Sequence, residues 1–332
     1  VGSEMCIRDR CMEGHSAGCE NALSDLSGTS SKVSVVIPLY NKRPYIERTI
    51  RSVLSQTIQD FEIVVVDDGS QDDGADIVRA IDDRRIRLIS QENRGVSAAR
   101  NRGVHEATSD FIAFLDADDE WRPTFLETIL RLRTRYPGAG IYATDRINCR
   151  PDGRTKPCRY IRIPPAPWEG VLPGYFITAG SSDQPICSSV IGIPKTVLEE
   201  VGGFPVRVRI GEDLITWFNI ALKYPIAFSR EIGAVYHMEA ENRTDKQARD
   251  KTWRLNLITR IEEAIRNGEV PVEKINEVQE YLAVYQIGMA WHYIRSGRNG
   301  EARTILSRCR TELLKRDRRV MYFRTFLPAP FR

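Results

Sequence analysis

The feature that most restricts the fold of this chain is the regular alternation of short β-branched runs with helical patterns between residues 33 and 115. Runs typical of buried strands stand at 33–38, 61–66, 86–89 and 111–115, and segments with apolar residues at helical spacing separate them. Parallel strands need a long crossover between them, which is usually a helix. The alternation therefore predicts an α/β fold with a Rossmann-like, mainly parallel sheet and helices on both faces.

The same patterns divide the 332 residues into regions. Residues 1–31 lack hydrophobic periodicity and the apolar core of a signal peptide, so we expect a disordered leader or sequence extraneous to the fold. Residues 32–241 form the α/β domain, which changes character near residue 120. Residues 242–332 have helical periodicity throughout and predict a C-terminal helical extension.

Composition excludes several classes of protein. A formal net charge of +3 gives no case for nucleic acid as a partner, and no apolar run is long enough to predict a membrane span. The seven cysteines show no zinc-site spacing and indicate free thiols in a reducing compartment. We therefore expect a cytoplasmic protein.

Acidic residues gather where the predicted strands end. The second strand leads into Asp67-Asp68-Gly69-Ser70 and the fourth into Asp116-Ala117-Asp118-Asp119. Ligands of open parallel sheets bind outside the carboxyl ends of the strands, and a divalent cation that bridges phosphates suits an Asp-x-Asp turn. The alternative interpretation is a pair of solvated turns, with Asp119 capping the next helix.

In the segment Asn93 to Asn101, a glycine precedes a predicted helix that begins with small residues. Its glycine and serine permit close approach of a ligand, and a helix N-terminus suits an anion. Arg100 has two candidate partners, a phosphate or one of the strand-end carboxylates. Tight packing of the helix on the sheet explains the small residues equally well.

Taken together, these segments resemble the family 2 glycosyltransferases, which have the GT-A fold. The resemblance covers residues 33–237 and rests on seven segments in the family's order: VSVVIPLYN at 33–41, FEIVVVDDGS at 61–70, NRGVSAARN at 93–101, FIAFLDADD at 111–119, VGGF at 201–204, GEDL at 211–214 and VYH at 235–237. It implies a nucleotide-binding half at 32–120 and an acceptor half at 121–241.

The resemblance implies roles for individual residues. Those expected to hold the nucleotide are Pro38, Tyr40, Asn41, Asp67, Asp68, Asn93, Gly95, Arg100 and Asp116. Asp118 is expected to contact a divalent metal, Mn²⁺ or Mg²⁺, with Asp116 or Asp119 as further ligands. His237 is expected either to bind the metal or diphosphate or to serve the structure.

The implied activity is an inverting transfer from a nucleoside-diphosphate sugar, with a UDP-sugar as the first choice, to a hydroxyl of a glycan or lipid-linked acceptor. Asp213 is implied as the general base and Glu212 as its neighbour in the site. The alternative is an inactive scaffold that keeps the nucleotide site. An oxidoreductase is disfavoured because no Gly-x-Gly-x-x-Gly turn follows the first strand.

The C-terminal extension is basic and carries several aromatic residues. One interpretation is a solvated cap on the catalytic domain. The other is peripheral contact with an anionic membrane surface, which would place the protein at the inner face of the plasma membrane.

Overall fold

The computed structural model describes residues 33–239 and 251–327. The expected leader at 1–31 and the expected boundary between residues 241 and 242 lie outside the described residues. The four predicted strands are present as β1 (Val33–Leu39), β2 (Phe61–Asp67), β3 (Ile86–Ser90) and β4 (Phe111–Phe114).

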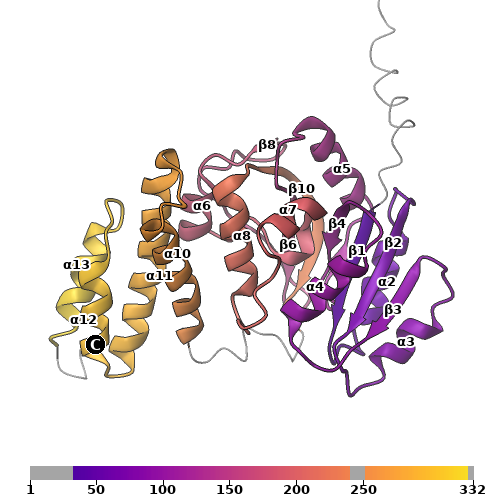
Figure 1. Cartoon of the computed structure of the whole chain (residues 1–332), viewed down its shortest axis with the longest axis horizontal. Helices are drawn as coiled ribbons and strands as arrows, with labels where there is room; N and C mark the ends of the chain where they lie inside the picture. The colour runs from indigo at the N-terminus through magenta and orange to yellow at the C-terminus, as the bar shows by residue number, and fades with distance from the viewer. Residues whose placement is uncertain (1–32, 240–250, 328–332) are drawn as a thin grey trace, which may run out of the picture. The chain divides into compact units, whose positions relative to one another are not determined.

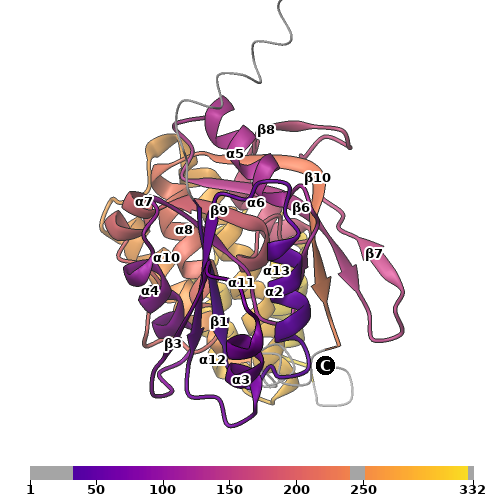
Figure 2. The same ribbon diagram turned by 90° about the vertical axis from the view of Figure 1, so that its right-hand side faces the viewer.

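These four strands are parallel neighbours in the order β3-β2-β1-β4. The helices between them are α2 (Ile46–Leu54), α3 (Gly74–Ala80) and α4 (Val96–Glu106). Figure 2 shows α2 and α4 on opposite sides of β1. A Cβ on Gly103 of α4 would lie 2.3 Å from Cγ1 of Val36, so the small residues of α4 do serve close packing on the sheet.

Beyond β4 the sheet continues with mixed directions. The strands are β9 (Ile191–Pro194), antiparallel to β4 and to β6 (Ile141–Cys149), then β10 (Ile226–His237), parallel to β6, and β5 (Glu120–Trp121) at the edge. The short strands β7 (Thr155–Pro157) and β8 (Glu169–Val171) pair with β6 and β10. This arrangement brings the end of β10 beside the turn that follows β4.

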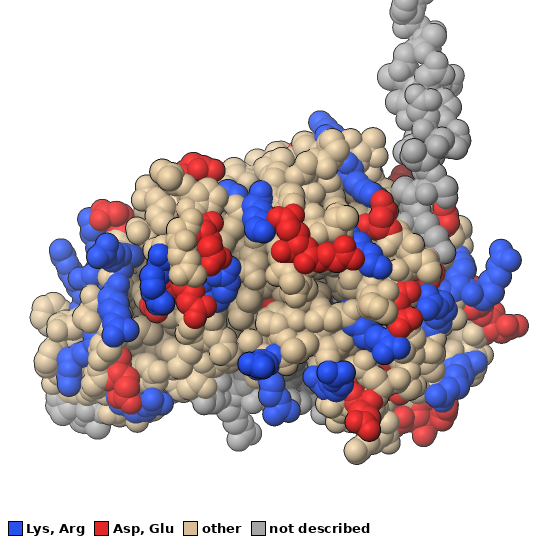
Figure 3. Space-filling view, in the orientation of Figure 1, with Lys and Arg blue, Asp and Glu red and all other residues tan. Residues whose placement is uncertain are grey.

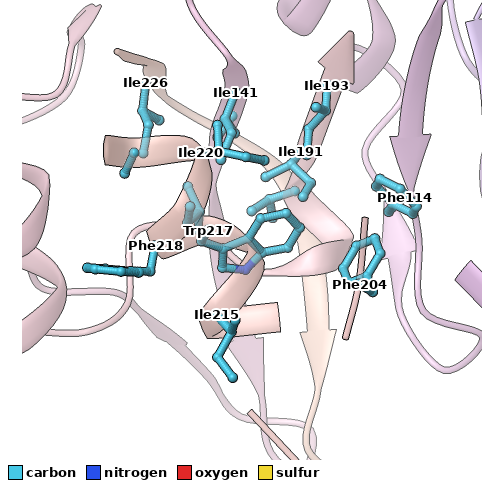
Figure 4. Close-up of a cluster of buried hydrophobic side chains, with 14 of the residues drawn as sticks. Phe114, Ile141, Ile191, Ile193, Phe204, Ile215, Trp217, Phe218, Ile220 and Ile226 are labelled. Carbon is cyan, nitrogen blue, oxygen red and sulfur yellow. The ribbon is translucent and has the colours of Figure 1, made fainter. Parts of the chain in front are cut away.

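The helices of this half are α5 (Phe125–Arg135), α6 (Tyr175–Ser181), α7 (Lys195–Glu200) and α8 (Glu212–Lys223). Trp217 of α8 is fully buried and stands edge-on to Phe204, which in turn meets Phe114 of β4 (Figure 4). The core therefore fixes α8 directly against the centre of the sheet.

The predicted C-terminal helices are α10 (Arg254–Arg266), α11 (Ile275–Arg295), α12 (Asn299–Arg308) and α13 (Lys315–Arg324). Helix α11 packs on α6, where a Cβ on Gly180 would lie 3.3 Å from Cδ2 of Tyr281 (Figure 1). Within the described ranges, no helix has the length and apolar character needed to span a bilayer.

Candidate active site

Asp68, at the end of β2, holds the loop that leads into α4. Its buried carboxylate accepts hydrogen bonds from Nε2 of Gln91 at 2.7 Å and from the backbone N–H groups of Arg94 and Gly95 at 2.9 and 2.8 Å. Gly95 has φ of +89° at the start of α4, a conformation that favours glycine. The strand end and the helix N-terminus are thus joined through one carboxylate.

A second set of hydrogen bonds ties the end of β1 to the same region. Asn41 accepts a hydrogen bond from the backbone of Gln71 at 2.8 Å, and its own N–H donates to Oγ of Ser70 at 3.1 Å. Asp67 accepts from the N–H of Ser70 at 3.0 Å. Tyr40 is exposed beside them. These residues lie together at one edge of the sheet, as do the half-buried Pro38 and the exposed Asn93.

Arg100 joins the two halves of the site. Its Nη2 donates to Oδ1 of Asp116 at 2.9 Å, and its Nη1 donates to Oε1 of Glu212 at 2.9 Å. The guanidinium is buried and lies 5.2 Å from the ring centre of Phe204. Of the two partners expected for Arg100, this structure has the strand-end carboxylate.

Burial of this cluster changes the protonation of Glu212 and Asp213. Burial, and then the charge of Asp213, raises the pKa of Glu212 to about 7. Burial also raises the pKa of Asp213, although the charge of Arg100 opposes this rise. Burial alone would lower the pKa of Arg100, but the charges of Asp116 and Glu212 raise it. Arg100 therefore stays charged, while Glu212 and Asp213 retain protons more readily than exposed carboxylates do.

Asp118 has two basic neighbours that the sequence patterns did not identify. Nζ of Lys42 lies 2.7 Å from its Oδ2, and Nη2 of Arg48 donates to its backbone carbonyl at 2.8 Å. Both bases come from the segment between β1 and the end of α2, so only the folded sheet brings them to this turn. A cationic group already stands at the carboxylate expected to meet a metal.

Asp119 points into the protein. Its Oδ2 accepts a hydrogen bond from Oγ of Ser189 at 2.5 Å, and its Oδ1 accepts from the N–H of His237 at 2.8 Å. Burial, then the charges of Asp118 and Asp116, raise its pKa well above the usual value. The interpretation of Asp119 as a cap of the next helix is wrong, because α5 begins only at Phe125 and the carboxylate binds other partners.

His237 ends β10 beside the same turn. Its Nε2 lies 3.4 Å from Oε1 of Glu120, and its Nδ1 lies 3.7 Å from Oε1 of Glu239. Burial, followed by the charge of Arg48, lowers its pKa. A neutral imidazole results, and this is the form that ligates metals.

The donor set suits a metal that shares its coordination with a substrate. The described residues contain no group of three or more His, Cys, Asp or Glu side chains placed to hold an ion by themselves. Mg²⁺ is commonly bound by one or two carboxylates together with substrate phosphates and water, rather than by a complete protein cage. Asp118 and Asp116, with His237 nearby, fit that mode.

The helix that carries Glu212 and Asp213 is fixed at its N-terminus by the C-terminal extension. Gly211 has φ of +79°, and a Cβ there would lie 2.9 Å from Cε3 of Trp253 in η3 (Lys251–Trp253). No motif in the sequence marks Trp253 as part of the site, because its partner lies in a different region of the chain.

Comparisons with known proteins identify relatives of this chain. The family model described as Glycosyl transferase family 2 matches residues 34–177. An uncharacterized glycosyltransferase of Nostoc sp. is 33% identical over 65% of this chain and 70% of its own length. TuaG of Bacillus subtilis, described as a teichuronic acid biosynthesis glycosyltransferase, is 30% identical over 67% of this chain and 85% of its own length. For a Rickettsia felis relative, at 34% identity, the match covers only 31% of that protein.

Two solved structures share the fold at low sequence identity. Staphylococcus aureus TarS residues 1–349, in complex with UDP-GlcNAc, gives a TM-score of 0.58 at 18% identity over 88% of this chain and 90% of that one. The mannosyltransferase PcManGT of Pyrobaculum calidifontis, in complex with GDP-Man and Mn²⁺, gives 0.55 at 20% identity over 88% and 83%. The fold is thus of the GT-A type. The relatives and the family model together show that this chain belongs to the family 2 glycosyltransferases.

Proposed function

We propose that the chain is a metal-dependent inverting glycosyltransferase that uses a nucleoside-diphosphate sugar. A UDP-sugar is the first choice of donor, and a hydroxyl of a glycan or lipid-linked acceptor in cell-surface polysaccharide synthesis is the target. The observation that carries the proposal is the position of Arg100 between Asp116 and Glu212, because it couples the donor turn to the helix of the proposed base.

The residues of the candidate site have separate roles in a single displacement. Asp118 and Asp116, with His237 beside them, would hold Mn²⁺ or Mg²⁺, which when bound offsets the charge of the diphosphate leaving group. Asp213 accepts the proton of the acceptor hydroxyl as the new bond forms. Its raised pKa makes it a better proton acceptor than an exposed aspartate would be.

The complexes of the two structural neighbours support a sugar nucleotide as donor, with UDP in one and GDP with Mn²⁺ in the other. The name of TuaG supports an acceptor in cell-envelope polysaccharide synthesis. An inactive scaffold is disfavoured, because Asp118 and Asp213 are both intact and lie in an organised site.

The proposal is tested by thermal unfolding with UDP, GDP, dTDP, CDP and NADH, each with and without Mn²⁺. A ligand at a hundred times its dissociation constant adds about 2.7 kcal/mol to the free energy of unfolding. We expect a metal-dependent shift with one nucleoside diphosphate that Asp118→Ala abolishes. A shift with NADH alone, or with none of these ligands, would refute the proposal.

We also propose that α13 contacts an anionic membrane surface, which would place the protein peripherally at the inner face of the plasma membrane. None of its residues is buried, and Phe323 and the nearby Phe326 are 71% and 62% exposed. Lys and Arg gather over this end of the protein (Figure 3). Exposed aromatic and basic residues together suit anionic lipid headgroups.

Flotation with liposomes tests this contact. The wild type should bind vesicles of phosphatidylglycerol and phosphatidylcholine but not phosphatidylcholine alone, and replacing Phe323 and Phe326 by serine should release it. Equal recovery of both proteins with the anionic vesicles would leave α13 as a solvated cap.

A further inference from the structure

Arg146 is a buried cation without a carboxylate partner. It lies on β6 with 8% of its surface exposed, and no Asp or Glu oxygen of the described residues lies within 4.0 Å of its guanidinium. Other buried guanidinium groups of this half are neutralised: Arg100 meets two carboxylates, and Nε of Arg230 lies 3.0 Å from Oδ2 of Asp145.

The partners that Arg146 does have are neutral. Its Nη1 donates to the backbone carbonyl of Gln184 at 2.8 Å, and the guanidinium lies 5.6 Å from the ring centre of Tyr236. Its Nε is buried and has no hydrogen-bond acceptor. The thiol of Cys187 offers no charge, since burial raises its pKa to about 12.

The adjacent carboxylate is already occupied. Oδ1 of Asp145 accepts hydrogen bonds from Oη of Tyr160 and from the backbone N–H of Arg146, both at 2.7 Å, while its Oδ2 faces Arg230. A buried charge is costly unless it is paired, and the charge of Asp145 acts on Arg146 only from beyond ion-pair distance.

Two neighbours of Arg146, Cys187 and Tyr236, stand beside residues of the proposed active site in the chain. Cys187 immediately precedes η2 (Ser188–Val190), in which Ser189 binds Asp119 and accepts a hydrogen bond from the N–H of Asp116 at 3.3 Å. Tyr236 immediately precedes His237. Arg146, on β6, therefore neighbours two segments that hold the turn of residues 116–119.

We infer that Arg146 binds an anionic group, a carboxylate or phosphate, carried by a sugar of the substrate and distinct from the diphosphate of the donor. A guanidinium presents donors in a planar fork that matches both groups, and such charged hydrogen bonds are the stronger ones. The inference rests on the proposed transferase function and adds that one of the two sugars is acidic. That sugar belongs either to the donor or to the acceptor.

Thermal unfolding of the full chain tests the site with defined probes. The nucleoside diphosphate found above and Mn²⁺ are kept saturating, so that the diphosphate site is filled. Glucuronate, glucose 1-phosphate and glucose are then added separately at constant ionic strength. We expect the two anionic sugars, but not glucose, to raise the melting temperature of the wild type.

Arg146→Met should abolish that rise while leaving the nucleotide shift unchanged, and Arg146→Lys should retain part of it. Arg230→Met is the matched control, because its guanidinium already faces Asp145. Affinity for the anionic sugar should fall about tenfold or more in Arg146→Met. If the anionic sugars do not raise the melting temperature of the wild type, the inference is overturned, and no variant is needed to show it.

Two further comparisons separate the outcomes. If Arg146→Met loses the nucleotide shift, the residue belongs to the diphosphate site and the inference is wrong. Direct binding of UDP-glucuronate and UDP-glucose, or of the corresponding pair with another base, shows which substrate carries the acidic sugar. If the protein prefers the acidic donor and the preference depends on Arg146, the acidic sugar belongs to the donor. If there is no such preference but glucuronate still binds, the acidic sugar belongs to the acceptor. Loss of all nucleotide shifts, with glucuronate binding intact, would refute the transferase proposal rather than the anion site.

Discussion

Nζ of Lys42 lies 2.7 Å from Oδ2 of Asp118, although the two residues are 76 positions apart in the chain. Both side chains are largely buried, with 14% and 13% of their surfaces exposed, so the pair is shielded from solvent. The lysine stands where a cation would approach the carboxylate. Lysine and a metal ion are therefore expected to compete for Asp118 until a diphosphate arrives to attract both.

Replacing Lys42 by methionine should strengthen Mn²⁺ binding in the absence of nucleotide. Loss of the competing ammonium frees Asp118, and one charged hydrogen bond corresponds to a change of roughly tenfold in affinity. Titration of free Mn²⁺ by electron paramagnetic resonance measures it. Lys195→Met is the control, since that ammonium donates to the carbonyl of Ala107 away from the site. Unchanged Mn²⁺ affinity would show that Lys42 does not compete.

Asp213→Asn should abolish transfer and spare binding. The amide cannot accept the proton of the acceptor hydroxyl, and general bases contribute about 10²- to 10⁴-fold to rate. Product formation and the nucleotide-dependent thermal shift are measured on the same sample. Asp110→Asn, at an exposed carboxylate, provides the control. Turnover retained in Asp213→Asn would assign the base elsewhere.

Stability should fall as the pH rises from about 4.5 to about 7, in part through Glu212. Its pKa is raised from 4.5 to about 7 in the folded protein, so the folded state holds a proton in this window that the unfolded state has released. The loss approaches roughly 3 kcal/mol, at 1.36 kcal/mol per unit. Urea unfolding at pH 5, 6, 7 and 8 measures it.

Glu212→Gln should flatten this profile, because the amide does not titrate. An unchanged slope in the variant would place the titrating proton on another carboxyl, for which Asp119 and Asp213 are the candidates, since the pKa of each is also raised.

Gly211→Ala should lower both stability and activity by more than Gly202→Ala does. Both glycines have positive φ, +79° and +82°, so both substitutions strain the backbone. Only the Cβ at Gly211 meets Trp253, at 2.9 Å, whereas the space around Gly202 is open. Steady-state rates and urea unfolding of the two variants isolate the contact. Equal losses of stability and activity in the two variants would mean that Trp253 does not support α8, the helix that carries Asp213.

The sequence predicts the first half of the fold well because its signals are local. Each of the strands β1 to β4 is a short, mainly apolar run, and acidic turns directly follow β2 and β4 in the chain. β6 and β9 are not predicted. Neither segment combines an apolar run with a clear turn after it. The two strands pair antiparallel with each other, and β9 also pairs with β4, so both depend on partners far along the chain.

The site shows the same division. The strand ends lead to Asp67, Asp68, Asp116 and Asp118 as candidates, whereas no pattern points to Lys42, Ser189 or Trp253. Lys42 sits in a polar turn like many others, and only the closed sheet brings its ammonium to Asp118. Asp119 is adjacent to Asp118 in the chain, yet the turn directs its side chain inward to Ser189. Sequence spacing does not reveal that reversal.

The contacts of the C-terminal helices also have a consequence for folding during synthesis, because they involve residues made last. Trp253 supports the helix of Asp213 from η3, and Tyr281 of α11 closes on α6. A nascent chain whose C-terminal segments are still within the ribosome has the residues of the parallel sheet outside it. Such a chain lacks the contact of Trp253 with the helix that carries Asp213. We therefore expect arrested chains ending near residue 240 to show no transferase activity.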